Sequence, residues 1–446
     1  MPPFLGKLIV LFGCNNIIFE VVVSNILRPV SVSELAHVKL NALTTANSIL
    51  KGKLDQGVFR RAICASLKCH PLAGATIQSD NKGLSFFKRI DLADELSVVN
   101  IDEHNREEEI IEDFINAKIA VENTLYKFLL IRLSEDKWRL VFAFHHSICD
   151  GRSIYRFFRG LVNDYNKLVS GRSVELGTLK LAPPIDEYSP DAVTCLSDDD
   201  IVSMIQTEID EAAPQNVFPA LMDKGDSNKL APRIKRCSLR FTSELSSSLI
   251  DRARENATTI SGALSASLQY AIMRVGEIDG LGNTMSIKYA VDLRERFAFD
   301  QSQNQLNCYV IAVNDFQQVK NRFDIENFWS LAGDVSQSLK RYVTSDSAFV
   351  NIRALGIEKK PVNAHVASML SNIGRVDLES ISGELVPESL SIQGVVMAPC
   401  IIVTAVYYLG TLQLDFLYTT PWVAEGKAKQ VFHEIETILK SVAASS

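Results

Sequence analysis

The chain has 446 residues, of which 47% are hydrophobic, and a formal net charge of −7 at pH 7. This length exceeds what one hydrophobic core usually covers, so we expect two domains. The acidic balance argues against a nucleic-acid binder, which would carry a basic surface, although an anionic cosubstrate needs only a local basic patch.

The first 25 residues form an apolar N-terminal extension. Lys7 and Glu20 interrupt it, whereas a transmembrane helix needs ~20 predominantly apolar residues with few or no charges. A signal peptide would need a more basic start and a small-residue cleavage site. We therefore expect an additional strand or helix packed on the body, or a poorly ordered extension. Contact with a membrane surface is the less favoured alternative.

Residues 26–180 are predicted to form the first domain. A helix over roughly residues 55–68 has Asp55 as its N-terminal cap and ends before Pro71. His70 lies at this corner and is interpreted as a structural residue. Residues 106–119 place apolar and acidic side chains on different faces of an amphipathic helix, so its charges are expected to be solvated.

A β-hairpin is predicted next, from Tyr126–Leu133 and Trp138–His145, because both segments alternate around a polar turn. The second strand is apolar on both faces and is expected to be buried. After Gly151 the apolar residues recur at helical spacing, and Ser153 is placed to cap that helix. The chain therefore turns from strand to helix, and Gly151 permits a tight turn.

This corner carries the stretch His145-His146-Ser147-Ile148-Cys149-Asp150-Gly151. An alcohol or amine that attacks a thioester must lose a proton, and the unperturbed pKa of histidine, about 6.5, suits that step. A side chain at the end of a buried strand is also held better than one on a free loop. Cys149 is interpreted as a small apolar spacer.

The corner resembles the His-His-x-x-x-Asp-Gly motif of the condensation-domain superfamily, which includes alcohol acetyltransferases and BAHD acyltransferases. The resemblance implies an α/β fold of two chloramphenicol-acetyltransferase-like domains with mixed sheets and an active-site channel between them. It implies that His146 is the general base of a direct acyl transfer. It further implies that His145 and Gly151 support the corner, and that Asp150 points away and pairs with an arginine.

Two other interpretations of these residues stay open. A buried histidine is usually a hydrogen-bonded core residue. His145, His146 and Asp150 also offer three metal ligands, but they straddle a strand end rather than one helix face. No His or Cys cluster elsewhere in the sequence completes a site, so we expect no metal and no bound cofactor.

Residues 181–235 are predicted to connect the two domains, because prolines and a polar run gather there. Residues 236–446 are the predicted second domain, which closes with an amphipathic helix around Val431–Leu439. Its other predicted elements are strands near 235–241, 285–293 and 306–313, helices near 243–254 and 259–273, and a hairpin of 401–408 and 411–419.

Two segments of this second half extend the resemblance. Val291-Asp292-Leu293-Arg294 resembles a family segment in which the arginine, here Arg294, is the partner of Asp150; a plain exposed arginine is the alternative. Ser371-Asn372-Ile373-Gly374 resembles the family's Ser-Asn-x-Gly segment near the channel. There Asn372, with Ser371 beside it, is a candidate contact for a reacting carbonyl. An Asn-x-Gly turn is the alternative.

The resemblance implies a monomeric acyltransferase that moves an acyl group from acyl-CoA to a small alcohol or amine. The first alternative is a freestanding condensation domain that uses an acyl carrier protein; no carrier or adenylation segment lies in the sequence, which favours free CoA. The second is a non-catalytic binding or scaffold protein of the same fold. The eight scattered cysteines include no Cys-x-x-Cys pair, which is typical of reduced thiols in a cytoplasmic protein.

Overall fold

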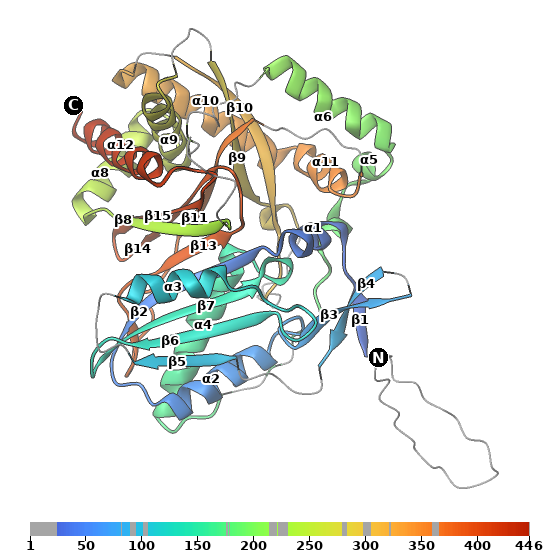
Figure 1. Ribbon diagram of the computed structural model, residues 1–446, viewed down its shortest axis with the longest axis vertical. Coiled ribbons are helices and arrows are strands. Elements are labelled where there is room, and N and C mark those ends of the chain that lie inside the picture. The colour runs from blue at the N-terminus through green and yellow to red at the C-terminus, as the bar shows by residue number, and fades with distance from the viewer. Residues whose placement is uncertain are drawn as a thin grey trace, which may run out of the picture.

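The computed structural model describes residues 25–445 apart from 82, 90–94, 101–105, 175–176, 178, 214–220, 222–230, 279–282, 298–304, 321–322 and 359–364. Two lobes lie one above the other along the long axis of the molecule (Figure 1). All but the last residue of the predicted extension, residues 1–25, lie outside the described residues, as does Cys14. Among the described helices, none combines the length and the apolar character that crossing a membrane requires.

The first lobe is built on a mixed sheet in which the predicted hairpin is confirmed. Its central strand, β7 (Lys137–His145), pairs antiparallel with β6 (Tyr126–Arg132) on one side and with β2 (Leu43–Lys51) on the other. The other elements are β5 (Leu96–Asn100), which runs parallel to β6, a small sheet of β1 (Ile26–Pro29), β4 (Gly83–Lys88) and β3 (Ala75–Asp80), and the helices α1 (Val32–Leu40), α2 (Gln56–Lys68), α3 (Glu107–Asn116) and α4 (Gly151–Val169).

The sheet of the first lobe is covered on both faces, which explains why β7 is apolar on both faces from Leu140 to Phe144. Phe142 and Phe144 pack with α2 and α4 on one face, and Val141 and Ala143 pack with α3 on the other. The N-terminal cap predicted for α2 is confirmed, because the Asp55 side chain accepts a hydrogen bond from the Val58 amide at 2.8 Å.

The second lobe has a six-stranded mixed sheet with helices on its outer face (Figure 1). Its strand order is β10-β9-β11-β14-β15-β8, and the predicted hairpin of β14 and β15 is confirmed. The strands are β8 (Arg233–Arg240), β9 (Asn283–Asp292), β10 (Val310–Val319), β11 (Val366–Arg375), β14 (Ile401–Tyr408) and β15 (Thr411–Thr420), and the helices are α5 (Asp191–Thr194), α6 (Asp198–Ala212), α8 (Ser243–Glu255), α9 (Ile260–Gly276), α10 (Ile325–Thr344), α11 (Ser347–Ala354) and α12 (Glu425–Ala444).

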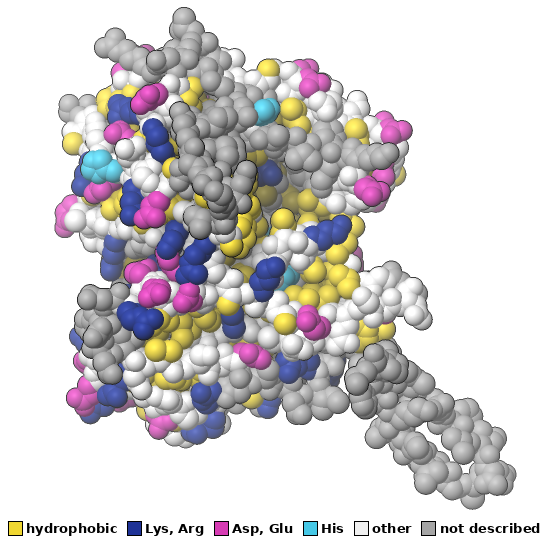
Figure 2. Space-filling view, viewed as in Figure 1, with side chains coloured by type: hydrophobic (Ala, Val, Ile, Leu, Met, Phe, Trp, Pro, Cys, Tyr) yellow, Lys and Arg dark blue, Asp and Glu magenta, His cyan; other side chains and the backbone are white. Residues whose placement is uncertain are grey.

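One feature of the topology was not predicted. Two strands of the second half, β12 (Val386–Pro387) and β13 (Ser391–Val395), leave their own lobe and pair antiparallel with β2 in the first sheet. The chain therefore crosses between the lobes a second time, and β13 lies at the boundary between them (Figure 1). Figure 2 shows hydrophobic side chains in the hollow between the two halves.

Two local predictions were wrong. The cap of α4 is Asp150 rather than Ser153, because the helix already begins at Gly151 and Ser153 lies inside its first turn. The predicted strand 306–313 begins only at Val310, since the backbone before it bonds to the first lobe instead of to β9.

Candidate active site

The two adjacent histidines lie where β7 ends and a short 3₁₀ turn, His146–Ile148, leads into α4. The backbone amide of His145 donates to the Leu125 carbonyl, and that of His146 donates to the Ala42 carbonyl, each at 2.8 Å. Neighbouring segments on both sides therefore hold the backbone of the pair before any side chain is considered.

His145 is a core residue with no exposed surface. Its Nδ1 lies 2.8 Å from the Ser147 hydroxyl and accepts a hydrogen bond from the Ser147 amide at 3.3 Å. Burial lowers the pKa of His145 to about 4, with a smaller contribution from His146, so the ring is neutral near pH 7. The supporting part that the family resemblance implies for His145 stays a prediction.

His146 is the histidine of the pair that reaches solvent. Burial lowers its pKa, and a hydrogen bond with its own backbone together with the charge of Asp150 opposes this shift only in part. Nδ1 lies 3.7 Å from the Cys308 sulfur. A ring proton on Nδ1 would leave the lone pair of Nε2 free to accept a proton.

The Nε2 atom of His146 faces the crossover strand β13. A Cβ atom added to Gly394 would lie 3.9 Å from Nε2, which is ordinary van der Waals contact. Because Gly394 has no side chain, the space in front of Nε2 stays open on this side. A reacting hydroxyl or amine could approach the nitrogen there.

Asp150 is directed away from the His146 ring and is almost completely buried. Its Oδ1 accepts hydrogen bonds from the amides of Arg152 and Ser153, at 3.1 and 2.9 Å. Its Oδ2 accepts from Arg294 Nη2 at 2.7 Å and from the Tyr309 amide at 2.8 Å. The predicted contact between Asp150 and Arg294 is thus present, and it joins the two lobes.

The electrostatics of this pair keep both groups charged. Burial alone would raise the pKa of Asp150, but the charge of Arg294 and the hydrogen bonds to the carboxylate outweigh it, so the pKa lies below its ordinary value. The guanidinium also donates to the Ser153 hydroxyl and to Asp292, at 2.8 and 3.1 Å. A plain exposed arginine is excluded, since the Arg294 side chain is 11% exposed.

Gly151 contributes to packing between the lobes, in addition to the predicted tight turn. It is the first residue of α4, and a Cβ atom there would lie 2.2 Å from Cδ1 of Ile373 on β11. The absence of a side chain therefore allows the second lobe to approach the corner.

Ser371 and Asn372 lie within β11, so the alternative of an Asn-x-Gly turn is wrong. The strand has an irregularity between Asn372 and Gly374, where the glycine has φ of 81°. Asn372 Nδ2 donates to the Ser261 hydroxyl of α9 at 2.9 Å, and its Oδ1 accepts from the Gly374 amide at 3.0 Å. Asn372 is thus engaged on the α9 face of the sheet, whereas alternation directs Ser371 to the opposite face.

His70 is a structural residue of the corner after α2, as predicted. Its Nδ1 accepts a hydrogen bond from the Leu306 amide at 3.1 Å, so it binds the segment that precedes β10. Burial lowers the pKa of His70 to about 4, which keeps the ring neutral and able to accept.

Sequence reasoning missed His37 and Cys308. The rings of His37 and His146 are stacked, with centroids 4.2 Å apart and planes 1° from parallel. The Cys308 sulfur lies 3.7 Å from His146 Nδ1 and 3.8 Å from His37 Nε2. These residues come from three distant segments and form no motif, so no sequence signal could have found them.

His37, His146 and Cys308 each offer one possible metal-ligand atom, and these three atoms lie within 4.8 Å of one another. The cluster is therefore a candidate metal site. Imidazole and thiolate are good zinc ligands, and the two sulfur–nitrogen distances are compatible with a shared ion. Each nitrogen lone pair, however, lies in its ring plane. Two parallel stacked rings cannot both direct their lone pairs at one ion between them, so the cluster as it stands does not fit a metal.

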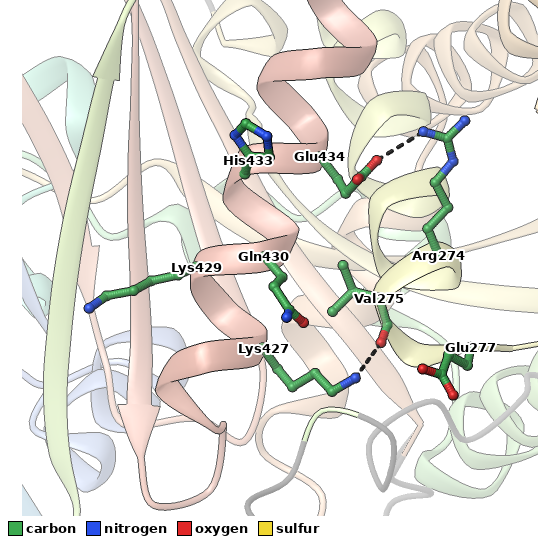
Figure 3. A pocket seen from close by; sticks show the side chains of 8 residues that line it. All are labelled: Arg274, Val275, Glu277, Lys427, Lys429, Gln430, His433 and Glu434. Carbon is green, nitrogen blue, oxygen red and sulfur yellow. Dashed lines mark hydrogen bonds and ion pairs between the residues drawn. The ribbon is translucent and has the colours of Figure 1, made fainter.

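A separate surface depression lies between the C-terminal end of α9 and α12, on the outer side of the second lobe (Figure 3). Arg274 pairs with Glu434 at 2.9 Å, and Lys427 Nζ donates to the Val275 carbonyl at 2.7 Å. Lys429 pairs with Glu425 at 2.6 Å. Since these cations already have partners, the depression offers no preformed anion site.

The fold and the site together define a class of protein. Its members have two α/β lobes, with a pair of histidines at a strand-to-helix corner on the boundary between the lobes. The condensation-domain family model matches residues 41–280, and the chain belongs to this family. No curated protein matches the sequence.

The chain is similar in fold to several solved structures. Polyketide synthase associated protein 5 from Mycobacterium tuberculosis is 16% identical, with a TM-score of 0.71 over 94% of this chain and 99% of that one. A trichothecene 15-O-acetyltransferase from Fusarium sporotrichioides is 11% identical, with a TM-score of 0.70 over 93% and 95%. The epimerization domain from the third module of tyrocidine synthetase B is 13% identical, with a TM-score of 0.69 over 94% and 97%.

Proposed function

We propose that this protein is an acyltransferase that moves an acyl group from a thioester to an alcohol or amine, with His146 as general base. The observation that carries the proposal is the place of the His146 ring: it is in contact with solvent, burial lowers its pKa, and Nε2 faces the space left by Gly394. Membership of the condensation-domain family and an acetyltransferase among the similar folds support it.

The proposed reaction is direct. Nε2 takes the proton of the acceptor hydroxyl or amine while the acceptor oxygen or nitrogen attacks the thioester carbonyl. The tetrahedral intermediate then collapses, the carbon–sulfur bond breaks, and the imidazolium returns its proton to the leaving thiolate. Histidine ends the cycle neutral, so no bound cofactor or metal is required.

Asp150 has no direct part in this proposed chemistry, because among the described residues its carboxylate accepts hydrogen bonds from Arg294 and from backbone amides. Its proposed role, with His145, Gly151 and Arg294, is to fix the corner that presents His146. Ser371 is retained as a candidate substrate contact. Asn372 is a weaker one, because both polar atoms of its amide are already hydrogen-bonded.

For the donor we propose acyl-CoA, with a carrier-protein thioester as the alternative. A thiol-release assay with a panel of acyl-CoAs and of small alcohols and amines tests both. Saturation by free acyl-CoA supports the first donor, and turnover seen only with an acylated carrier protein moves the alternative into first place.

The same assay tests the base. His146→Ala should lose roughly 10²- to 10⁴-fold in rate, the usual contribution of a general base. Its thermal midpoint should stay near that of the parent protein, because the ring is not part of the buried ion pair. His433→Ala, at an exposed histidine on α12, is the matched control and should keep full activity. Parent-like turnover in His146→Ala would exclude His146 as the base, and absence of turnover in every combination would favour a non-catalytic protein.

A further inference from the structure

His37 is placed by α1, which is anchored by its own N-terminal cap and by the segment after the first lobe. The capping box of α1 is complete, since the Ser31 side chain accepts from the Glu34 amide and the Glu34 carboxylate accepts from the Ser31 amide. Glu34 also pairs with Arg28 at 2.5 Å. The Ser33 amide donates to Asp186 at 3.0 Å, which ties α1 to the segment after the first lobe. The His37 ring therefore has a fixed support.

Cys308 is placed from the other side by the segment that precedes β10. This segment is bonded to the first lobe at three points: the Leu306 amide to His70, the Asn307 carbonyl to Ser153, and the Tyr309 amide to Asp150. Cys308 lies among these three anchors and is 5% exposed. The second lobe thus contributes the sulfur that lies beside Nδ1 of His146.

We propose that His37 is a positioning residue for His146, which holds the ring by stacking on one face while Cys308 contacts its Nδ1 edge. This inference rests on the proposed function, and it adds that the base is held by groups from both lobes. Among the described residues the Cys308 sulfur is the side-chain atom at hydrogen-bonding distance from the ring. The stacked neighbour therefore limits rotation about the Cβ–Cγ bond and keeps Nε2 directed past Gly394.

Stacking has a second consequence, because it keeps water from one face of the ring. Burial is the largest cause of the lowered pKa of His146, and it also lowers the pKa of His37 well below its ordinary value. Two neutral rings stack without repulsion at neutral pH. The titratable or charged groups around His146 are His145 and Asp150 on its own corner, His37 and Glu34 on α1, Cys308 ahead of β10, and Arg294 behind Asp150.

The test compares His37→Ala with His37→Phe, which keeps an aromatic face but has no ring nitrogen. If stacking positions the base, His37→Ala should lose about 10- to 100-fold in kcat with KM changed less than about twofold, the penalty expected for a misplaced catalytic group. The acid limb of its pH–rate profile should move to higher pH as water reaches the ring. His37→Phe should restore most of kcat and the position of that limb, and His433→Ala should change neither.

A readout independent of turnover comes from nitrogen-15 NMR of histidine-labelled protein, in which only seven histidines contribute. The parent protein should show His146 protonated on Nδ1 with a pKa below about 6.5, the unperturbed value. His37→Ala should raise that pKa, and His37→Phe should not. Cys308→Ala, which leaves the stack in place, should weaken the Nδ1 preference with little change in pKa.

The outcomes separate the two proposals. Loss of kcat in His37→Ala without rescue by His37→Phe, or an unchanged His146 pKa in His37→Ala, would overturn the positioning role. If the protein shows no transferase activity while the pKa of His146 changes in the variants as expected, His37 positions the ring but the proposed function is wrong. Thermal midpoints identify any variant whose fold is lost. If a His37 variant loses its fold, Cys308→Ala supplies the independent test of how the ring is held.

Discussion

Asp150 and His146 lie four residues apart on one corner, yet they are held in opposite ways. The Asp150 carboxylate is buried and accepts hydrogen bonds from three backbone amides and a guanidinium. The His146 ring reaches solvent and is held mainly by a stacked ring and a thiol. The difference separates the part of the motif that builds the corner from the part that meets a substrate. Removing the first should affect stability, and changing the second should affect rate.

The largest expected effect is a loss of folding stability when Asp150 is changed. Asp150→Asn removes the closer of the two carboxylates that pair with Arg294. Leaving a buried charge with no partner typically costs about 3–5 kcal/mol of folding free energy, and Asp292 keeps the loss at or below that range. Soluble yield, thermal midpoint and rate should therefore all fall, whereas His146→Ala should lower rate alone. Chemical denaturation of both variants measures this. Equal midpoints for Asp150→Asn and the parent would show that the pair does not brace the corner.

The same pair predicts a pH dependence. Because the folded-state pKa of Asp150 is below its unfolded value, the stabilisation is fully present above the unfolded pKa of about 3.9 and is lost as pH falls through the folded value. The parent should thus lose part of its stability only below about pH 4, and Asp150→Asn should lack that component of the acid transition.

A smaller effect tests the contact between the corner and the second lobe. Gly151→Ala places a methyl group against Ile373 Cδ1, and overpacking of this kind typically costs about 1–3 kcal/mol. Ile373→Val removes Cδ1 and should recover most of that loss in the double variant. A double-mutant cycle of Gly151→Ala and Ile373→Val measures the coupling energy between the two positions. A coupling energy near zero would mean that the absence of a side chain at Gly151 does not serve the contact with Ile373.

The smallest effect concerns Asn372. Asn372→Ala removes its hydrogen bond to Ser261 and should cost about 0.5–1.5 kcal/mol of stability. Because its amide faces α9, KM and kcat should change little. A loss of kcat without loss of stability would instead support the contact with a reacting carbonyl that the sequence suggests. Ser371→Ala is the matched variant on the opposite face.

The sequence by itself determined the local elements and the first half of the site. Alternation identified β7 and its hairpin, helical spacing identified α4, and the adjacent histidines with Asp-Gly marked the corner, because these signals depend on residues close together in the chain. The partnership of Asp150 with Arg294 was also expected, but only through a family resemblance. The two residues are 144 positions apart in the sequence, so no local pattern could have predicted their contact.

Only the tertiary structure decided what surrounds the base. His37 from α1, Cys308 ahead of β10 and Gly394 on β13 meet at His146 because β13 crosses into the first sheet and the segment before β10 bonds to the first lobe at three points. A histidine in a short helix, a lone cysteine and a glycine in a strand carry no pattern of their own. Their role arises from the packing of two lobes, which is a long-range property that local periodicity does not contain.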